Sequence, residues 1–165
     1  MTLFSFLWSG DVKIMEIEKS IKQRKPFLNE YQRALVNLLF TNGWLADRQK
    51  QFFKPYDITA KQYNILRILR GANKPLSTSD IRDRMLDKMS DTTRLVERML
   101  KKGWVLKKIN KSDRRLVDVV LSDKGELLLQ QIDKTIGDVY NLVSRLTAIE
   151  AKQLNNLLDK MRGED

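Results

Sequence analysis

SDTTRLVERMLKKGWVLKKINKSDRRLVDVVLSDKG, residues 90–125, predicts a basic helix followed by a basic β-hairpin. Ser90 can cap this helix, and Gly103 suits the position just beyond its last turn. Its apolar residues recur at the spacing of one buried stripe, namely Leu95, Val96, Met99 and Leu100. Two β-rich runs, residues 104–109 and 116–121, follow and are joined by six polar residues. Proteins use a basic helix beside a basic hairpin to bind DNA.

The same stretch carries a recognisable series of residues. It comprises Thr93, Arg94, Leu95, Val96, Glu97, Arg98, Lys101, Lys102 and Gly103 in the helix, Asp113, Arg114 and Arg115 in the hairpin, and Ser122, Asp123, Lys124 and Gly125 after it. This series resembles the signature of the MarR family of bacterial and archaeal transcription regulators, and the order of elements is similar from about Phe27 to Met161. The resemblance implies a homodimeric winged helix-turn-helix protein that binds pseudo-palindromic operators and is often released by a small ligand or by oxidation.

Positive charge is concentrated in this part of the chain. The protein has 31 Lys and Arg against 21 Asp and Glu, a formal net charge of +10. Between Ile81 and Arg115 there are twelve basic and five acidic residues. Clustered positive charge attracts a polyanion, although on charge alone a solvated charged face is an equal interpretation.

Several kinds of chemistry are excluded by the composition. The 165 residues include no cysteine and no histidine, which excludes disulfides and thiol-based redox sensing and removes the usual general base and transition-metal ligand. No phosphate-binding loop, dinucleotide glycine fingerprint, serine elbow or HExxH motif occurs. We therefore expect neither an enzyme nor a cofactor or metal site.

The N-terminal segment shows no targeting pattern. Its apolar run, residues 3–8, is too short to span a bilayer and lacks the flanks of a signal peptide. We therefore expect a cytoplasmic protein without membrane contact. Met15 opens a polar helical sequence, so residues 1–27 are interpreted as an N-terminal extension that is mobile or in part foreign to the native protein, with residues 1–14 arising from an upstream start.

The remaining pattern predicts a mainly α fold with a small β-hairpin wing. Residues 58–122 are expected to form a winged helix-turn-helix lobe, and residues 28–57 and 123–165 to supply dimerisation helices. The helix 28–53 carries two apolar strips, one including Leu28 and Leu35 and the other Leu39 and Trp44. Two apolar strips need two surfaces to cover them. One can be the rest of the chain's own domain, and the other a second copy of the chain. Burial of both strips in one monomer core is the alternative.

The helical segments of the lobe are bounded by caps. Pro55 ends the first helix, and Thr59 with Gln62 forms a capping box for a helix that runs to Gly71. Further caps predict a short helix over 78–86, a long helix from Ser122 to about Leu146, and a last helix from Thr147 through Met161. Only Asp87, Lys88 and Met89 separate the short helix from the helix near Ser90, the spacing of a helix-turn-helix.

On DNA, a recognition helix presents its N-terminal residues to base edges. These residues are Ser90, Asp91, Thr92, Thr93 and Arg94. We expect Arg94 to read a base, with a phosphate contact as the alternative, and Thr93, Arg98 and Lys101 to contact the backbone. Asp91 either accepts from a cytosine amino group or caps the helix. The family resemblance assigns the wing contact to Arg115 braced by Asp113, with Arg114 also available to the minor groove or its phosphates.

An effector site is the least specific of these expectations. The family resemblance implies a crevice between the dimerisation helices and the winged-helix lobe, which maps loosely onto Tyr31, Phe40, Trp44, Phe52, Tyr56, Tyr63 and Arg67. An aromatic residue at helical spacing is more often part of the core than of a pocket. The expected partners are double-stranded DNA, a second copy of the chain and a small aromatic or amphipathic effector, or no effector. A winged-helix module for protein or RNA, without sequence-specific DNA binding, is the alternative function, against which Lys111, Arg114 and Arg115 favour phosphates.

Overall fold

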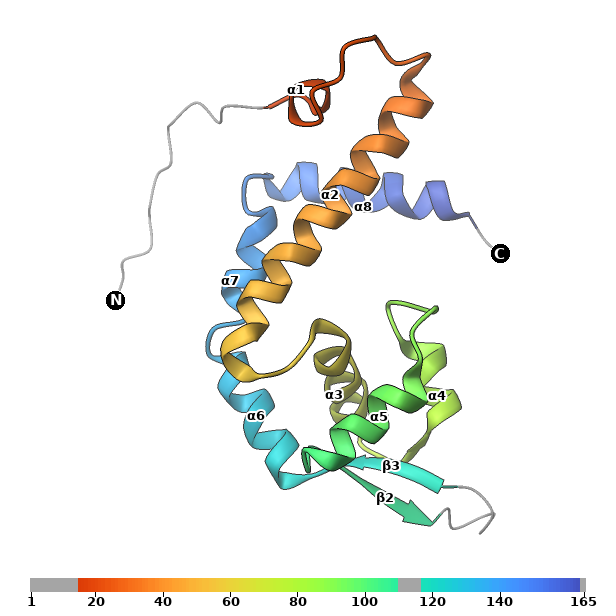
Figure 1. Cartoon of the computed structure of the whole chain (residues 1–165), viewed down its shortest axis with the longest axis vertical. Helices are drawn as coiled ribbons and strands as arrows, with labels where there is room; N and C mark the ends of the chain where they lie inside the picture. The colour runs from red at the N-terminus through yellow and green to blue at the C-terminus, as the bar shows by residue number, and fades with distance from the viewer. Residues whose placement is uncertain (1–14, 110–116, 164–165) are drawn as a thin grey trace. The chain divides into compact units, whose positions relative to one another are not determined.

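The computed structural model describes residues 15–109 and 117–163, which form helices and one small sheet (Figure 1). Contacts divide the chain into two compact units. The first contains residues up to Leu45 and from Leu142 onward, and the second contains Ala46–Asn141. No helix in these described stretches is long and apolar enough to cross a membrane.

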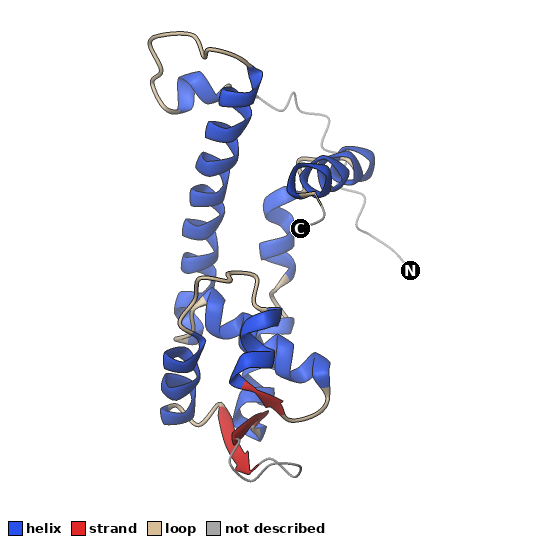
Figure 2. Ribbon diagram, turned by 90° about the vertical axis from the view of Figure 1, so that its right-hand side faces the viewer, coloured by secondary structure: helices blue, strands red, loops and turns tan. Residues whose placement is uncertain are grey.

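The second unit is a winged helix-turn-helix. It contains the end of α2 (Glu30–Phe53), η1 (Lys54–Tyr56), α3 (Ala60–Ala72), β1 (Leu76–Ser77), α4 (Thr78–Arg84), α5 (Thr92–Lys101), β2 (Val105–Ile109), β3 (Val117–Leu121), α6 (Asp123–Asp133) and α7 (Gly137–Tyr140). The strands, red in Figure 2, form one antiparallel sheet. Their order in the sheet is β1-β3-β2. Val119 is paired with Leu76 on one side and with Lys107 on the other. The core of this unit is fully buried and includes Ile65, Leu66, Ile81, Met99, Val105, Val119, Leu129 and Ile132.

Local caps start the helices where the sequence predicts. Thr59 forms a capping box with Gln62 at the start of α3. Ser77 forms one with Asp80 before α4, and Ser122 caps α6 by accepting from the Gly125 amide at 3.0 Å. Each cap satisfies amide donors that the first helical turn leaves free. The predicted caps at Thr59 and Ser122 are confirmed.

The recognition helix begins one residue later than expected. Asp91, not Ser90, is the N-cap of α5, since its carboxylate accepts from the Arg94 amide at 3.0 Å. The predicted cap at Ser90 is wrong because Ser90 is buried within the preceding turn. At the other end Gly103 adopts φ 73°, and the Trp104 amide donates to the Met99 carbonyl at 3.0 Å. This left-handed C-terminal motif confirms the role predicted for Gly103.

The sheet and the helix after it differ in part from expectation. The hairpin of β2 and β3 is confirmed, but β1 was not predicted, because a two-residue strand has no periodicity to recognise. The long helix expected from Ser122 to Leu146 is wrong, since α6 ends at Asp133. There the amides of Thr135 and Ile136 both donate to the Ile132 carbonyl, which also accepts from the Thr135 hydroxyl at 3.2 Å. This local bonding tightens the chain before α7 and η2 (Asn141–Val143).

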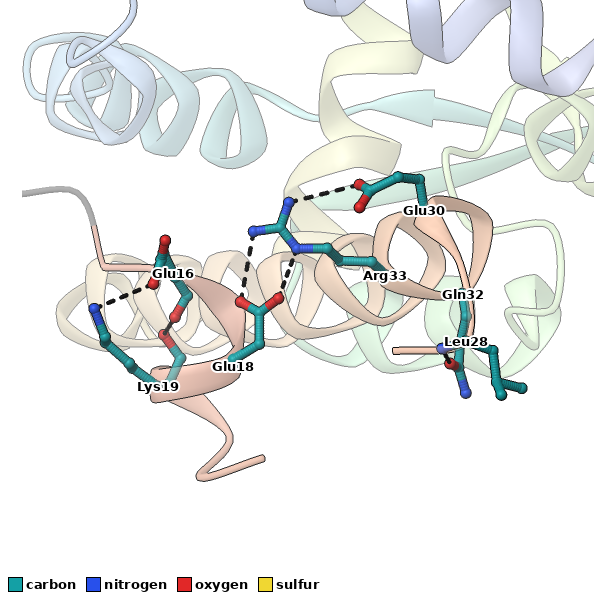
Figure 3. A network of polar contacts seen from close by, with 8 residues as sticks. Glu16, Glu18, Lys19, Leu28, Glu30, Gln32 and Arg33 are labelled. Carbon is teal, nitrogen blue, oxygen red and sulfur yellow. Dashed lines mark hydrogen bonds and ion pairs between the residues drawn. The ribbon is translucent and has the colours of Figure 1, made fainter. Parts of the chain in front are cut away.

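The first unit consists of α1 (Ile17–Ser20), the start of α2 and α8 (Ala148–Arg162). α1 is fastened to α2 by Arg33, whose Nε lies 2.7 Å from a Glu18 carboxylate oxygen (Figure 3). This bond holds the pKa of Glu18 below its ordinary value. α2 begins two residues later than predicted, because the Asn29 side chain accepts from the Gln32 amide at 2.9 Å.

Apolar side chains of this unit are largely exposed. On α2, Leu35 is 57% and Leu39 63% exposed, and on α8 Leu157 is 64% exposed. No side chain of α8 is buried, and on α2 the one buried side chain is Phe53, at the end that belongs to the second unit. The alternative that both strips of α2 are buried within one monomer core is therefore wrong. These faces need a covering that the single chain does not provide.

Candidate nucleic-acid interface and effector pocket

The exposed face of α5 carries three cations and one acidic residue, Glu97. Thr92, Val96 and Met99 hold the helix on the core, which leaves Arg94, Arg98 and Lys101 exposed on the other side. Within the described residues none of these three cations forms an ion pair with a carboxylate. A row of exposed cations without protein counterions favours an anionic partner.

A shallow hollow of about 170 Å³ lies at the N-terminal end of this face. It is lined by Lys61, Ser90, Asp91, Arg94, Leu95 and Arg98. Lys61 comes from α3, and its Nζ lies 2.6 Å from the Asp87 carboxylate, which holds the pKa of Asp87 below its ordinary value. Arg94 and Arg98, which have no carboxylate partner among the described residues, are suited to one phosphate group at this hollow. Sequence reasoning missed Lys61 because its proximity to α5 depends on the tertiary fold.

Two of the residues predicted to face base edges do not present their side chains to solvent. Ser90 and Thr92 are buried, although Thr92 is the first residue of α5. Asp91 is exposed but its carboxylate is used as the cap. Thr93 and Arg94 are the exposed members of the predicted set at this end. The wing residues Asp113, Arg114 and Arg115 lie outside the described residues.

Lys102 has a structural role despite its place in the basic series. Its Nζ lies 2.7 Å from the Asp57 carboxylate and 2.5 Å from the Asp57 carbonyl oxygen. The same ammonium stands 4.4 Å from the centre of the Trp104 ring. These contacts tie the C-terminal end of α5 to the segment before α3. On the wing strands, Lys107 and Lys108 are exposed and point to opposite faces of the sheet.

A second cavity, of about 320 Å³, lies beside α3. It is lined by Gln49, Phe53, Ala60, Tyr63, Asn64, Arg67, Leu86, Ile136, Val139 and Tyr140. Most of its wall is apolar or aromatic, and Arg67 supplies its positive charge. We call this cavity the α3 pocket.

Arg67 has phenol partners in place of a carboxylate. Its Nη1 donates to the Tyr63 hydroxyl at 3.0 Å, and the phenols of Tyr63 and Tyr140 raise its pKa. The neighbouring Arg70 differs, because Asp133 accepts from it twice, at 2.7 and 3.2 Å. Within the described chain Arg67 is thus the arginine of α3 whose charge no ion pair balances. An apolar pocket with such a cation is suited to an aromatic anion.

The predicted effector residues fall into separate groups. Tyr63 and Arg67 line the α3 pocket, whereas Tyr56 packs against Phe52 and shares a hydrogen bond of 2.7 Å with Thr135. The remaining three, Tyr31, Phe40 and Trp44, belong to the first unit and do not line the pocket. Sequence reasoning missed Gln49, Asn64, Leu86 and Tyr140. Asn64 lies three residues before Arg67 and therefore on the same face of α3. This spacing was the sequence signal that could have placed Asn64 beside Arg67 in the pocket.

Comparison with known proteins agrees with this architecture. The model of the MarR family matches residues 58–117. The chain is 31% identical over 130 residues to the multiple antibiotic resistance protein MarR of Salmonella typhimurium, covering 77% of this chain and 90% of that protein. It is 24% identical over 154 residues to the HTH-type transcriptional regulator PecS of Dickeya dadantii, covering 91% and 93% of the two chains.

Solved structures give the same result. A mutant MarR from Escherichia coli in complex with operator DNA superposes with a TM-score of 0.74 at 27% identity, covering 83% of this chain and 99% of that one. The organohalide-sensing regulator RdhR, in its form bound to 2,4-dichlorophenol, has the same fold, with a TM-score of 0.75 at 19% identity over 85% of this chain and 86% of that one. The chain therefore belongs to the MarR family and is a transcriptional regulator built on a winged helix-turn-helix.

Proposed function

We propose that the protein acts as a homodimeric repressor that binds a pseudo-palindromic DNA site and is released by a small aromatic anion. The observation that carries the DNA-binding part is the exposed row of Arg94, Arg98 and Lys101 on α5 without carboxylate partners among the described residues. A recognition helix enters the major groove, whose phosphates flank it and whose base edges meet its N-terminal turn. The operator complex of the related Escherichia coli MarR supports this assignment.

Within this interface each residue has a distinct role. Arg94, in the first turn of α5, reads a base, and Thr93, Arg98 and Lys101 contact the backbone. Arg98 holds a phosphate at the hollow at the start of α5, which it lines together with Arg94 and with Lys61, whose ammonium is paired with Asp87. From the family resemblance we further propose that Arg115, braced by Asp113, and Arg114 contact the minor groove or its phosphates.

Homodimerisation follows from the exposed apolar faces of the first unit. Side chains of α2 and α8 such as Leu35, Leu39 and Leu157 are more than half exposed. Pairing with a second copy through a two-fold axis covers the same face on both chains. A two-fold dimer presents two α5 helices, which is why the expected site is pseudo-palindromic.

The α3 pocket is the proposed effector site. Arg67 offers a charge-assisted hydrogen bond to a carboxylate or phenolate, and Phe53, Tyr63 and Tyr140 offer apolar surface to a ring. The structurally similar RdhR is described in a complex with 2,4-dichlorophenol, an aromatic ligand of suitable class. An effector that binds the free protein more tightly than the DNA-bound protein weakens DNA binding. The loss in binding free energy equals the difference between the two effector affinities, expressed as free energies.

Footprinting of the purified protein on the DNA upstream of its own gene tests the proposal. We expect protection of a short symmetric site at protein concentrations that leave a random duplex of equal length unprotected. Arg67→Ala is expected to keep the footprint and to lose its sensitivity to 2,4-dichlorophenol. Equal binding to every duplex, or binding to RNA or protein alone, would favour the interaction-module alternative.

A further inference from the structure

The turn between α4 and α5 is held against α3 by two polar side chains. Asn64 accepts the amide hydrogen of Leu86 at its Oδ1, at 3.0 Å, and one helical turn earlier Lys61 binds the Asp87 carboxylate at 2.6 Å. The other carboxylate oxygen of Asp87 accepts from the Met89 amide at 3.0 Å. The turn is therefore organised around groups that α3 holds in place.

Apolar packing anchors the chain at Met85, which is 2% exposed, but contributes little to the position of residues 86–89. Leu86 is 89% and Met89 93% exposed, so neither side chain anchors the segment in the core. Asp91, the N-cap of α5, follows four residues after Asp87. The position of the N-terminal end of the recognition helix relative to α3 thus depends in part on the bonds made by Lys61 and Asn64.

One of these two bonds is made in the wall of the α3 pocket. Asn64 and Leu86 both line that cavity, together with Arg67, whereas Lys61 lines the hollow at the start of α5. A molecule in the pocket therefore contacts the same side chain that holds the turn. An occupant that displaces Leu86 or draws the Asn64 amide toward itself breaks the bond of 3.0 Å.

We propose that Asn64 is a positioning residue that fixes the start of α5 and couples occupation of the α3 pocket to DNA affinity. The coupling rests on the effector role proposed for the pocket, whereas the positioning role does not. Loss of the Asn64 bond frees the Leu86 amide, loosens the turn and lets the first turn of α5, with Arg94, shift from the arrangement that binds DNA. The pocket and the recognition helix then form two sites linked by one two-state element.

Amide hydrogen exchange in the full-length protein, without any ligand, tests the positioning role. Asn64→Ala is expected to speed exchange of the Leu86, Met89 and Ser90 amides by about five- to tenfold, the effect of losing one hydrogen bond. Asn64→Asp keeps an acceptor and is expected to restore slow exchange. Asn155→Ala, an exposed asparagine on α8, is the control and should leave this turn unchanged. Unchanged exchange in Asn64→Ala would overturn the positioning role.

The coupling is tested by DNA affinity with and without 2,4-dichlorophenol or benzoate as the probe. In the wild type we expect the probe to weaken DNA binding by about 5- to 150-fold, the usual range for linked sites. In Asn64→Ala this factor should fall toward one while titration still detects probe binding. A wild-type factor retained in Asn64→Ala would overturn the coupling. A wild type that ignores both probes would contradict the effector role and the coupling with it, but faster exchange in Asn64→Ala would still establish the positioning role.

Discussion

Arg94 is the residue on which sequence preference is expected to depend most. It is exposed in the first turn of α5 and has no carboxylate partner among the described residues, whereas Lys101 lies two turns further on, on the flank of the helix. Arg94→Ala should cost about 1–3 kcal/mol on the specific site and relax preference at one base pair, and Lys101→Ala should weaken all sequences alike. Fluorescence anisotropy with specific and random duplexes measures both. If Arg94→Ala lost equal affinity for the specific and the random duplex, Arg94 would contact a phosphate and would not read a base.

Gly125 is the residue whose replacement should most clearly destabilise the wing side of the fold. A Cβ at this position would lie 2.1 Å from the Trp104 carbonyl oxygen and 2.8 Å from a methyl carbon of Leu121. Because the first of these atoms belongs to the backbone, relief requires movement of the chain. Gly125→Ala is therefore expected to lower the free energy of unfolding by about 1–3 kcal/mol in urea titrations.

Gly137 provides the matched control for this change. It also lies in a helix, and a Cβ there would meet nothing within 4 Å. Gly137→Ala should leave stability unchanged or raise it by up to about 1 kcal/mol, since alanine has less freedom to lose on folding. Equal destabilisation by the two alanines would show that the contact of Gly125 with Trp104 is not the cause.

At the scale of elements, the helices with side-chain caps were predictable and the irregular ones were not. Thr59 with Gln62 and Ser122 with Gly125 are local patterns that sequence displays directly. β1 exists only because β3 lies beside it, so no local pattern indicates it. The break after Asp133 depends on a hydroxyl bonding back to Ile132, which the regular apolar spacing of that segment conceals.

The two candidate sites were predictable to different extents. The basic face of α5 could be predicted from the sequence, because Arg94, Arg98 and Lys101 recur at helical spacing within one helix. The α3 pocket did not, because it joins residues from Gln49 to Tyr140. Helical spacing shows which residues of the 24-residue α2 share a face, but not which of its turns lines a cavity. This is why Tyr31 was predicted together with Tyr63 and Arg67, although only the latter two line the cavity.

The wing is the element whose charge separates DNA binding from a protein-interaction role. Replacing Arg114 and Arg115 together by Gln should leave folding and dimerisation intact, since a polar hairpin connection contributes little core. DNA affinity should fall, and the slope of log affinity against log salt should shrink by up to about 0.9 for each lost phosphate contact. Asp113→Ala should weaken binding less than the double variant. Unchanged binding in the double variant would remove the wing from the interface, and tighter binding after Asp113→Ala would exclude a bracing role.

For the whole molecule, we expect a stable dimer. The exposed apolar faces of α2 and α8 require a partner, and a second copy supplies one of matching shape. Sedimentation at micromolar concentration should show a species of twice the 19.4 kDa chain mass. Leu39→Glu, on the exposed strip of α2, should shift the protein toward monomer, while Leu106→Glu, on an exposed strand of the wing, should not. A wild-type protein that sediments only at the chain mass would contradict dimerisation.

Selection of DNA from a random duplex library by the whole protein tests sequence-specific binding by a homodimer. It requires no knowledge of the operator. We expect enrichment of one pseudo-palindromic sequence whose half-sites are about 10 base pairs apart, because a two-fold dimer presents two recognition helices. The same selection with Arg94→Ala should lose preference at one symmetric pair of positions. Recovery of random sequence by the wild type, or of a site without symmetry, would contradict sequence-specific binding by a homodimer.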